Sequence, residues 1–467
     1  MAETRAFKIY SKLPVFCQNI ACSLAGLKMR RQRYGKCFRE FLRFLDQSQW
    51  WPYEKQLEYQ NEQLRKIIDH AYASVPYYRR VMDERHLTPS DIRTVEDLPK
   101  LPILTKDDVR HHCADLISTA LSKDQIVQSK TGGTTGKALK LFQDKETIQR
   151  QWAVWWRHRQ RFGLGLGDEF IAFAGRDVVS LDSLKPPFWR RNRPMHQTYV
   201  SLHHMTEENM PALVDYLSRR KVKYYSGYPS GVYLLAHYLV ENNITLPHPP
   251  KVVTTGAETL LEHQKEMMAR AFPGAIVTDQ YGASENCGNI SECEEHRYHV
   301  DMEFGAIELL PLSDDLPNLR KIICTGFWNM AMPLIRYDIG DIATVPEGET
   351  ACPCGRKSPI VTKIDGRIES YIITPDGRQM GRLDFIFKET HAIEEAQLVQ
   401  DCLEKVIVKV VANQNYSEEE EKRLLSGLHK YLGDVIEFEI EYVDTIPRAA
   451  NGKFRQIVSN VFKERHA

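Results

Sequence analysis

A loop rich in glycine and threonine, residues 129–137, carries the strongest chemical signal in the chain. It reads Ser-Lys-Thr-Gly-Gly-Thr-Thr-Gly-Lys. Glycines let a backbone fold tightly enough for several N–H groups to converge on phosphate oxygens, and the hydroxyl and ammonium groups add further donors. It is not a Walker A loop, because its spacing from Gly132 to Lys137 is one residue short and Ala138 stands where a magnesium-binding hydroxyl is required. A plain glycine turn is the alternative. The predicted phosphate-binding residues are Thr131, Gly132, Gly133, Thr134, Thr135, Gly136 and Lys137.

Five further motifs follow this loop along the chain. They are Thr254-Thr255-Gly256-Ala257-Glu258, Tyr281-Gly282-Ala283-Ser284-Glu285, Arg336-Tyr337-Asp338-Ile339-Gly340-Asp341, Gly366-Arg367-Ile368-Glu369 and Pro447-Arg448-Ala449-Ala450-Asn451-Gly452-Lys453. Each motif is weak alone, since a lone carboxylate is usually solvated and a lone lysine usually lies on the surface. In this order the set resembles the adenylate-forming superfamily of acyl-CoA ligases. The resemblance is greatest to the phenylacetate–CoA ligase branch and its capsular-polysaccharide-biosynthesis-like subgroup, and it spans about residues 50–455.

The resemblance implies that these motifs surround ATP. It places the glycine- and threonine-rich loop on the β- and γ-phosphates, Tyr281 near the adenine, and Asp341 at the ribose hydroxyls. The ATP/AMP-binding residues that it implies outside the loop are Gly256, Ala257, Glu258, Tyr281, Gly282, Ser284 and Asp341. The catalytic residues that it implies are Glu285, which would hold Mg²⁺, Arg367, which would lie by the ribose and α-phosphate, and Lys453, which would bridge the carboxylate and α-phosphate.

These residue types suit the implied chemistry. A carboxylate must attack a phosphorus that is already surrounded by negative charge, so positioning, Mg²⁺ and a cationic side chain lower the barrier. Glutamate suits a hard cation, an ionised aspartate accepts both hydroxyls of a vicinal diol, and the long lysine stem delivers a point charge. Glu369 stands at a hinge position where the family usually has Asp or Lys. Because a carboxylate is kept, we expect the rotation of the small domain to be kept too.

The implied function is ATP-dependent activation of a carboxylic acid as an acyl-adenylate, with release of pyrophosphate and transfer to coenzyme A. Three alternatives stay open at this point. The first is an adenylyltransferase that leaves AMP on its product. The second is acyl transfer to an amine or a sugar in cell-envelope polysaccharide biosynthesis. The third is a scaffold without catalysis, which the phosphate loop and Lys453 disfavour.

Three cysteines and one histidine have the types of a structural zinc site. Cys293 and His299 are separated by five residues, and Cys352 and Cys354 follow in a Cys-Pro-Cys-Gly-Arg stretch. Zinc takes four such ligands tetrahedrally. The Cys-x-Cys spacing is tighter than usual, and four ordinary side chains are the alternative, although the subgroup often carries this pair of motifs. Such a clamp would hold the loops that bear Glu285 and Asp341.

The acid substrate is poorly encoded. Trp152, Phe173 and Tyr228 fall where the family builds its acyl pocket, with Trp155, Trp156 and Pro229 close to them in sequence. Ordinary core aromatics are an equally good interpretation. Two nearby arginines, Arg157 and Arg176, could pair with a second acidic group on the substrate.

Composition limits the class of protein. The 467 residues include 62 Lys+Arg and 62 Asp+Glu, and this balance argues against a general nucleic-acid binder. No apolar run reaches the ~20 residues that span a bilayer, and no signal-peptide pattern is present, so a cytoplasmic protein is expected. A homodimer is left open.

The patterning predicts an α/β fold with three parts. Short apolar runs such as 170–173, 224–227 and 252–256 alternate with helical stretches between residues 126 and 365. We expect a basic, amphipathic arm at 1–52, a large multi-layer adenylate-forming domain at 53–366, and a small mobile α+β domain at 367–467. In that last part strands are expected at 405–411 and 435–443, with a helix starting at the Ser417-x-x-Glu420 capping box.

Residues 13–45 of the arm are basic and apolar together. Two interpretations remain open from the sequence: peripheral contact with an anionic membrane surface, or a helical arm packed on the body. The spacing of Phe38, Phe41, Leu42 and Leu45 favours packing.

Overall fold

The computed structural model describes residues 5–130, 139–176, 178–180, 182–312, 317–348, 351–367, 372–375, 379–380, 392–414, 416–432, 435–448 and 454–461. The predicted phosphate loop at 131–137, the hinge residue Glu369 and the catalytic Lys453 lie outside these ranges, so their roles stay predictions.

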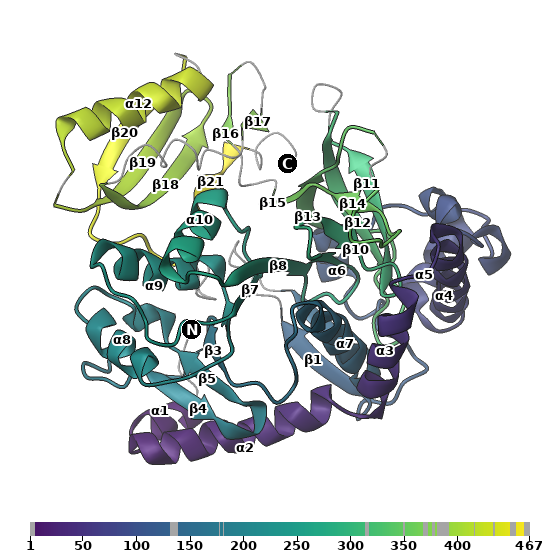
Figure 1. Cartoon of the computed structure of the whole chain (residues 1–467). Coiled ribbons are helices and arrows are strands. Elements are labelled where there is room, and N and C mark those ends of the chain that lie inside the picture. The colour runs from purple at the N-terminus through teal and green to yellow at the C-terminus, as the bar shows by residue number, and fades with distance from the viewer. Residues whose placement is uncertain are drawn as a thin grey trace.

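The centre of the large domain is a nine-stranded sheet in the order β14-β10-β9-β8-β7-β6-β3-β5-β4 (Figure 1). Its five parallel strands are β3 (Phe170–Phe173), β5 (Gln197–Val200), β6 (Tyr224–Gly227), β7 (Val252–Gly256) and β8 (Ile276–Gly282). Antiparallel strands extend both edges: β4 (Trp189–Asn192), β9 (Asn289–Glu292), β10 (Tyr298–Val300) and β14 (Ile360–Val361). The predicted strands at 170–173, 224–227 and 252–256 are confirmed to the residue.

Helices cover this sheet with their apolar faces. They are α7 (Lys145–Arg161), α8 (Met210–Ser218), α9 (Pro229–Glu241) and α10 (Glu262–Ala271). Leu235 and Leu239 of α9 and Met268 of α10 are fully buried in one cluster with Phe173 and Tyr225 of the strands. Apolar residues three and four apart lie on one helix face, which explains why these segments cover the sheet.

A second sheet of four antiparallel strands holds another part of the site. It runs β11 (Gly305–Pro311), β12 (Leu319–Gly326), β13 (Tyr337–Thr344) and β15 (Lys363–Arg367). Helices α4 (Tyr53–Ser74) and α5 (Pro76–Glu84) pack into the same core, and the chain breaks between them at Pro76 because proline cannot continue the first helix. Shorter elements join these parts: η1 (Pro89–Asp91), η2 (Val95–Lys100), α6 (Lys106–His111), the hairpin β1 (Ile126–Lys130) and β2 (Lys140–Asp144), η3 (Arg193–Met195) and η4 (Leu202–His204).

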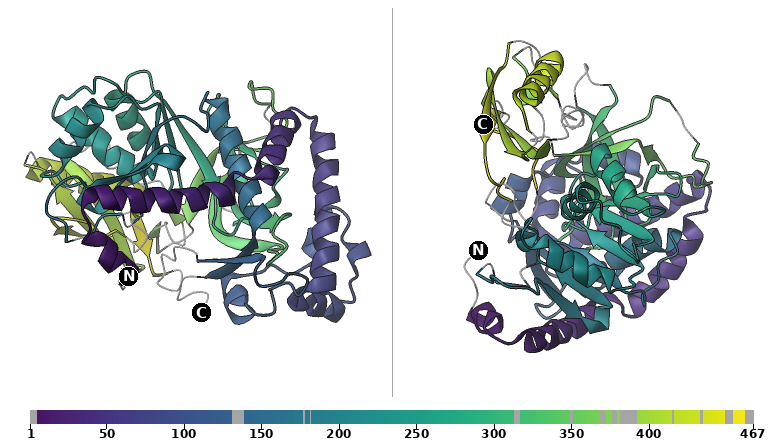
Figure 2. Two further views of the ribbon diagram at one scale, coloured as in Figure 1. Left: turned by 90° about the horizontal axis from the view of Figure 1, so that it is seen from below. Right: turned by 60° about the vertical axis from the view of Figure 1, so that its left-hand side comes forward.

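The N-terminal arm consists of α1 (Arg5–Ser11), α2 (Val15–Arg33) and α3 (Lys36–Ser48). Phe38, Phe41, Leu42 and Leu45 of α3 are buried against α7, as the packed-arm interpretation expects. Helix α2 instead lies along the outside of the sheet, beside its edge strand β4 (Figure 2). Among the described residues no helix is long and apolar enough to cross a membrane.

The small domain has its own core. Its sheet has the order β20-β19-β18-β21, built from β18 (Ile393–Cys402), β19 (Lys405–Ala412), β20 (Glu437–Tyr442) and β21 (Ile457–Ser459). Helix α12 (Glu418–Leu432) covers it, and β16 (Ile372–Ile373) pairs with β17 (Gln379–Met380) beside it. The predicted cap of α12 is present, since Glu420 N donates to Ser417 Oγ at 3.4 Å. The α/β fold with a small α+β domain is confirmed; the boundaries at 52 and 366 stay predictions.

Candidate active site

Six of the seven predicted nucleotide residues outside the loop lie at the carboxyl ends of the neighbouring parallel strands β7 and β8 or just after them. Strand β7 ends at Gly256 and β8 ends at Gly282. In open α/β sheets ligands bind at this edge. Gly256 is required by space, because a Cβ there would lie 2.7 Å from the carbonyl oxygen of Gln280 on the next strand. The carboxyl ends of β7 and β8 therefore place the motifs around Gly256 and Gly282 side by side.

Glu258 ties this edge to two other segments. Its Oε2 accepts from the backbone N–H of Ser230, in the first turn of α9, at 3.2 Å. Its Oε1 accepts from the backbone N–H of Phe454 at 2.9 Å. Phe454 directly follows Lys453 in the chain and lies on the C-terminal side of the small domain's β20. The C-terminal segment thus reaches the rim of the predicted nucleotide site.

Asp341 is the centre of a buried polar cluster. It is only 7% exposed, its Oδ2 accepts from the Tyr281 hydroxyl at 2.8 Å, and its Oδ1 lies 2.7 Å from Arg367 Nε. Strands β13 and β15 place Asp341 opposite Arg367 in the ladder, whereas Tyr281 comes from β8 of the other sheet. Burial and the neighbouring Asp341 charge raise the pKa of Tyr281 well above its usual value, so this phenol stays a hydrogen-bond donor.

Glu285 lies next to this cluster. It is 6% exposed, and the Tyr337 hydroxyl donates to its Oε1 at 3.3 Å. Burial raises the pKa of Glu285, while the positive charges of Arg367 and Lys106 act in the opposite direction. A carboxylate that loses its hydration in this way gains from an added cation, so Glu285 suits the magnesium role that the resemblance implies.

Lys106 is a functional candidate that sequence reasoning missed. It is the first residue of α6, which Thr105 caps by accepting from Asp108 N at 3.1 Å. Leu104 pairs with β13 through two backbone hydrogen bonds of 2.9 Å, and this pairing carries Lys106 to Gly340. A Cβ on Gly340 would lie 2.8 Å from Lys106 Nζ and 3.5 Å from an Arg367 nitrogen. The capping box was visible in the sequence, but nothing there links residue 106 to residue 341.

The four predicted metal ligands converge. Cys293, His299, Cys352 and Cys354 offer ligand atoms that all lie within 4.8 Å of one another. The sulfurs of Cys293 and Cys352 are 3.7 Å apart, and Cys354 Sγ is 3.4 Å from His299 Nε2. Two thiolates bound tetrahedrally to zinc at ~2.3 Å have sulfurs ~3.8 Å apart, so both distances fit the edges of a zinc tetrahedron. His299 Nδ1 also lies 3.3 Å from Ser358 Oγ, a contact that can orient the ring.

The predicted acyl-pocket aromatics do not form one group. Trp155 reaches the site, because a Cβ on Gly282 would lie 3.1 Å from its Nε1, and it packs edge-on against Trp152 with ring centroids 4.7 Å apart. Phe173 is fully buried in the core against Tyr225, and its carbonyl accepts from Tyr228 N at 2.7 Å.

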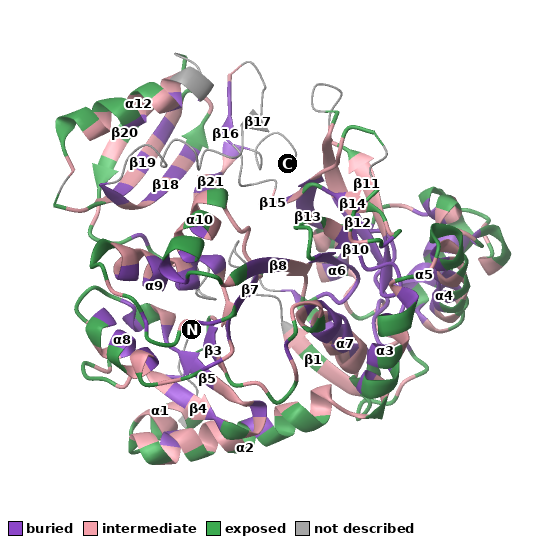
Figure 3. Cartoon of the chain, viewed as in Figure 1, coloured by how far each residue is buried: buried purple, intermediate pink, exposed green. Residues whose placement is uncertain are grey.

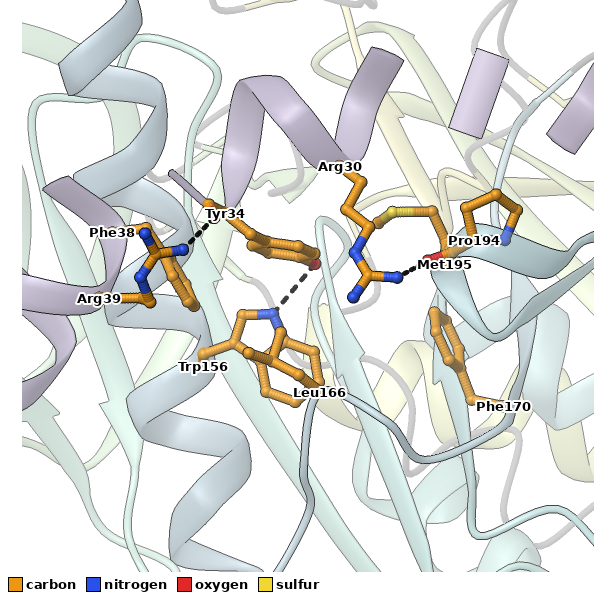
Figure 4. Close-up of a pocket in the computed structure, with 9 residues that line it drawn as sticks. All are labelled: Arg30, Tyr34, Phe38, Arg39, Trp156, Leu166, Phe170, Pro194 and Met195. Atoms are coloured by element: carbon orange, nitrogen blue, oxygen red, sulfur yellow. Dashed lines mark hydrogen bonds between the residues drawn. The ribbon is translucent and has the colours of Figure 1, made fainter. Parts of the chain in front are cut away.

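Trp156 points elsewhere. Its Nε1 donates to the Tyr34 hydroxyl at 3.1 Å, and it lines a separate cavity of about 240 Å³ beside the N-terminal arm (Figure 4).

Arg157 is not available to a substrate. It is buried, and its guanidinium is bonded to Asp301 at 2.5 Å and to Glu303 at 2.8 Å. The expectation that Arg157 could pair with an acidic group of the substrate is therefore wrong, because two buried carboxylates already satisfy its charge. Arg176, by contrast, is exposed and stacks over the Tyr199 ring at 5.4 Å.

Comparison with known proteins identifies the family. The CapK C-terminal domain matches residues 372–460. Over 461 residues the chain is 27% identical to Protein CapK of Staphylococcus aureus, a match that covers 97% of this chain and 99% of that protein. The chain is thus similar to CapK along nearly its whole length.

Other relatives connect this CapK-like chain to a family of ligases. It is 25% identical to the phenylacetate-coenzyme A ligase of Thermus thermophilus over 346 residues, which cover 69% of this chain and 72% of that one. The chain is a CapK-like member of the adenylate-forming ligase superfamily. It is related to phenylacetate–CoA ligases, as the motifs indicated.

Solved structures show the same fold. A 2-hydroxyisobutyryl-CoA ligase in its postadenylation state superposes with a TM-score of 0.68 at 17% identity, covering 89% of this chain and 92% of that one. An anthranilate CoA ligase bound to anthranoyl-AMP gives a TM-score of 0.52 at 13% identity, with 86% and 79% covered. At such identities the likeness establishes the α/β fold with its smaller C-terminal domain.

Proposed function

We propose that this adenylate-forming ligase uses ATP and Mg²⁺ to convert a carboxylic acid into an acyl-adenylate, and then transfers the acyl group to the thiol of coenzyme A with release of AMP. The observation that carries the proposal is the cluster of Asp341, Tyr281, Arg367 and Glu285, which three separate strands and a loop bring to the carboxyl edge of the sheet. Its donors and acceptors match a nucleotide: a carboxylate for the ribose hydroxyls and cations for the α-phosphate.

In this proposal the protein positions and stabilises charge. An oxygen of the acid attacks the α-phosphorus, a P–O bond forms, and the bond to the leaving pyrophosphate breaks. Arg367 and Lys106 lie where negative charge collects, and Lys453 would add a further cation from the small domain. Mg²⁺, when bound at Glu285, would neutralise phosphate charge. Asp341 keeps lone pairs for the ribose hydroxyls beside its bonds to Tyr281 and Arg367.

The aromatic pair Trp152 and Trp155 supports an apolar or aromatic acyl group, because Trp155 lies beside Gly282 at the same edge. Tyr228, which directly precedes α9, would border the acyl group, whereas Phe173 is buried in the core. The coenzyme A acceptor rests on the relatives named phenylacetate-coenzyme A ligase. The alternatives are an amine or a sugar as the acceptor, or a product that retains AMP. Chemical analysis of the product distinguishes them.

The test is a screen for ATP–pyrophosphate exchange over aromatic, fatty and hydroxy acids. We expect exchange that depends on one class of acid, and we expect Lys453→Ala to abolish it while the protein remains folded by circular dichroism. Lys422→Ala, an exposed lysine on the same domain, is the matched control and should leave exchange unchanged. Exchange that persists in Lys453→Ala would refute the role of that lysine, and no exchange with any acid would refute acid activation.

The second step is tested by mass spectrometry of the product formed with the active acid. A thioester formed only when coenzyme A is added supports the proposed acceptor. A product that retains AMP identifies an adenylyltransferase instead, and an amide or ester formed with an amine or a sugar identifies the other acceptor class.

We also propose that Cys293, His299, Cys352 and Cys354 hold a structural zinc ion. The four ligands leave no open coordination position, so the ion would brace the protein without catalysis. Elemental analysis should find zinc in the purified protein and lose it in Cys352→Ser and Cys354→Ser. The exposed Cys402→Ser is the control and should keep zinc. A wild-type protein purified without chelators and free of zinc would refute this proposal.

A further inference from the structure

Helix α2 carries its large apolar side chains on the face toward solvent. Phe16, Ile20, Leu24 and Leu27 are 72%, 45%, 63% and 44% exposed. Their spacing of four, four and three residues places them on one side of the helix, within a single stripe. The outer side of α2 is correspondingly coloured as exposed or intermediate in Figure 3. Four large apolar groups in one contiguous stripe are unusual on a water-facing helix.

The face of α2 toward the protein is polar. Gln18 Oε1 accepts from Arg190 at 2.5 Å, and Asn19 Oδ1 accepts from the backbone N–H of Arg191 at 2.8 Å. Gly26 lies so close to Asn192 that any Cβ would overlap its side chain. These contacts fasten α2 to the edge strand β4 by hydrogen bonds and close packing. The helix is therefore held firmly with its apolar stripe outward, the reverse of an ordinary surface helix.

The surroundings of the stripe carry one sign of charge. From residue 6 to residue 39 the chain has Lys and Arg but no Asp or Glu. Lys28 and Arg31 are exposed and lie at helical spacing from Leu24 and Leu27, so they extend the stripe on the same face. Within the described residues neither forms an ion pair with a carboxylate.

The cavity in Figure 4 lies at the C-terminal end of α2 and adds to this basic character. Arg30 and Arg39 line it together with apolar walls that include Phe38, Trp156 and Phe170. Arg30 donates to the carbonyl of Pro194 at 3.1 Å and Arg39 to that of Tyr34 at 3.2 Å. Each guanidinium has further N–H groups to offer a phosphate oxygen.

We propose that the α2 face, defined by Phe16, Ile20, Leu24, Leu27, Lys28 and Arg31, docks the enzyme on an anionic phospholipid bilayer. An apolar stripe bordered by cations is what such an interface requires, because the apolar groups enter the headgroup–acyl boundary while the cations meet lipid phosphates. A second copy of the chain fits less well. A two-fold contact through this face would bring together two surfaces that carry cations and no carboxylate to pair with them.

Docking in this way leaves the active site accessible. Helix α2 lies against the edge strand β4. The site lies at the carboxyl ends of β7 and β8, where the backbone N–H of Phe454 contacts Glu258. In Figure 1 α2 runs along the bottom of the molecule and the small domain is at the top. The proposal is independent of which acid is activated.

The test is flotation of the full-length protein with two kinds of vesicle, phosphatidylcholine alone and an equal mixture of phosphatidylcholine and phosphatidylglycerol. We expect binding to the anionic vesicles only. Binding should fall as the salt concentration is raised from about 0.1 M to about 1 M, since screening shortens the reach of the cations.

Two double variants separate the apolar and the cationic contributions. Phe16→Ser with Leu24→Ser, and Lys28→Glu with Arg31→Glu, should each lower partition into anionic vesicles by about tenfold or more. The matched controls change exposed residues of the same kind elsewhere. Leu184→Ser with Val435→Ser removes two apolar side chains, and Lys123→Glu with Lys221→Glu reverses two charges. Because all of these side chains are exposed, the variants should keep the fold, which circular dichroism checks.

Three outcomes would overturn the proposal. The first is absence of binding to anionic vesicles by the wild-type protein. The second is equal loss of binding in the control variants. The third is a dimer in light scattering that the Phe16→Ser, Leu24→Ser variant converts to a monomer without any change in lipid binding, because that result would assign the face to a second copy of this chain.

Discussion

At the scale of single residues, Gly340 determines how closely Lys106 and Arg367 can approach the backbone of β13. Its φ of +73° is a left-handed conformation that side chains with a Cβ rarely adopt, and Lys106 Nζ lies next to it. Gly348 has a similar φ of +83°, but its Cβ would meet nothing within 4 Å. The two glycines therefore share backbone strain on substitution and differ only in what surrounds them.

We predict that Gly340→Ala and Gly348→Ala each lower the free energy of unfolding by about 1–2 kcal/mol, because both place a Cβ at positive φ. Only Gly340→Ala should also lower pyrophosphate exchange, since its methyl displaces Lys106. Urea titrations and exchange assays on both variants check this. Equal activity in the two variants would show that the position of Lys106 does not matter.

Asp279 is a second residue whose role can be measured, through the dependence of stability on pH. It is buried in the middle of β8, where it accepts from the Thr255 hydroxyl at 2.6 Å and its backbone N–H donates to Glu292. Burial and the nearby Glu292 charge raise the pKa of Asp279 from 3.8 to about 7. The folded protein thus keeps a proton that the unfolded chain loses near pH 3.8.

Because the folded state binds this extra proton, stability falls as the pH rises between about 4 and 7, by up to roughly 1.4 kcal/mol per pH unit. We predict that Asp279→Asn, which cannot ionise, flattens this part of the stability profile. Urea unfolding at about pH 5 and about pH 8 measures the slope, with the exposed Asp182→Asn as control. A slope unchanged in Asp279→Asn would contradict the raised pKa.

At the scale of elements, a buried ion triad fastens the N-terminal arm to the body. Arg157 of α7 bonds Asp301 and Glu303, and the Ser48 hydroxyl at the end of α3 donates to Glu303 at 2.5 Å. Despite burial, the Arg157 charge holds the pKa of Glu303 below its usual value. The loop after β10 and helices α3 and α7 are therefore joined through one guanidinium.

Removing that guanidinium should be costly. We predict that Arg157→Met lowers the free energy of unfolding by about 3–5 kcal/mol, because two buried carboxylates lose their counter-charge. Arg159→Met, which removes a partly exposed arginine stacked over Trp156 at 5.5 Å, should cost well under half as much. Urea denaturation of both variants compares them, and similar losses would indicate that packing rather than charge dominates.

At the scale of the whole molecule, Glu258 joins the large domain to the C-terminal segment. One carboxylate accepts from Ser230 N and from Phe454 N, so the two parts of the chain share a single acceptor. We predict that Glu258→Ala loosens the small domain and speeds cleavage between the domains in limited proteolysis by several-fold. The thermal midpoint of the large domain should change little. The exposed Glu262→Ala is the control, and equal cleavage rates would show that this contact does not restrain the domain.

Much of the architecture could be predicted because it is local. The strands at 170–173, 224–227 and 252–256 and the break at Pro76 follow from apolar runs and proline alone. The same holds for the caps at Thr105 and Ser417, whose hydrogen bonds span three residues. The zinc ligands were named from residue type and motif, although they lie on segments about fifty residues apart.

What the sequence by itself determined is the family, the order of its motifs and the elements that carry them. Only the tertiary structure decided that Lys106 lies beside Gly340, that Arg157 is bonded to two carboxylates, and that α2 turns its apolar stripe outward. The physical reason is that these outcomes depend on contacts between distant segments. The periodicity of the sequence indicates that a helix has an apolar face. Which face of α2 is buried depends on its hydrogen bonds to the edge strand β4.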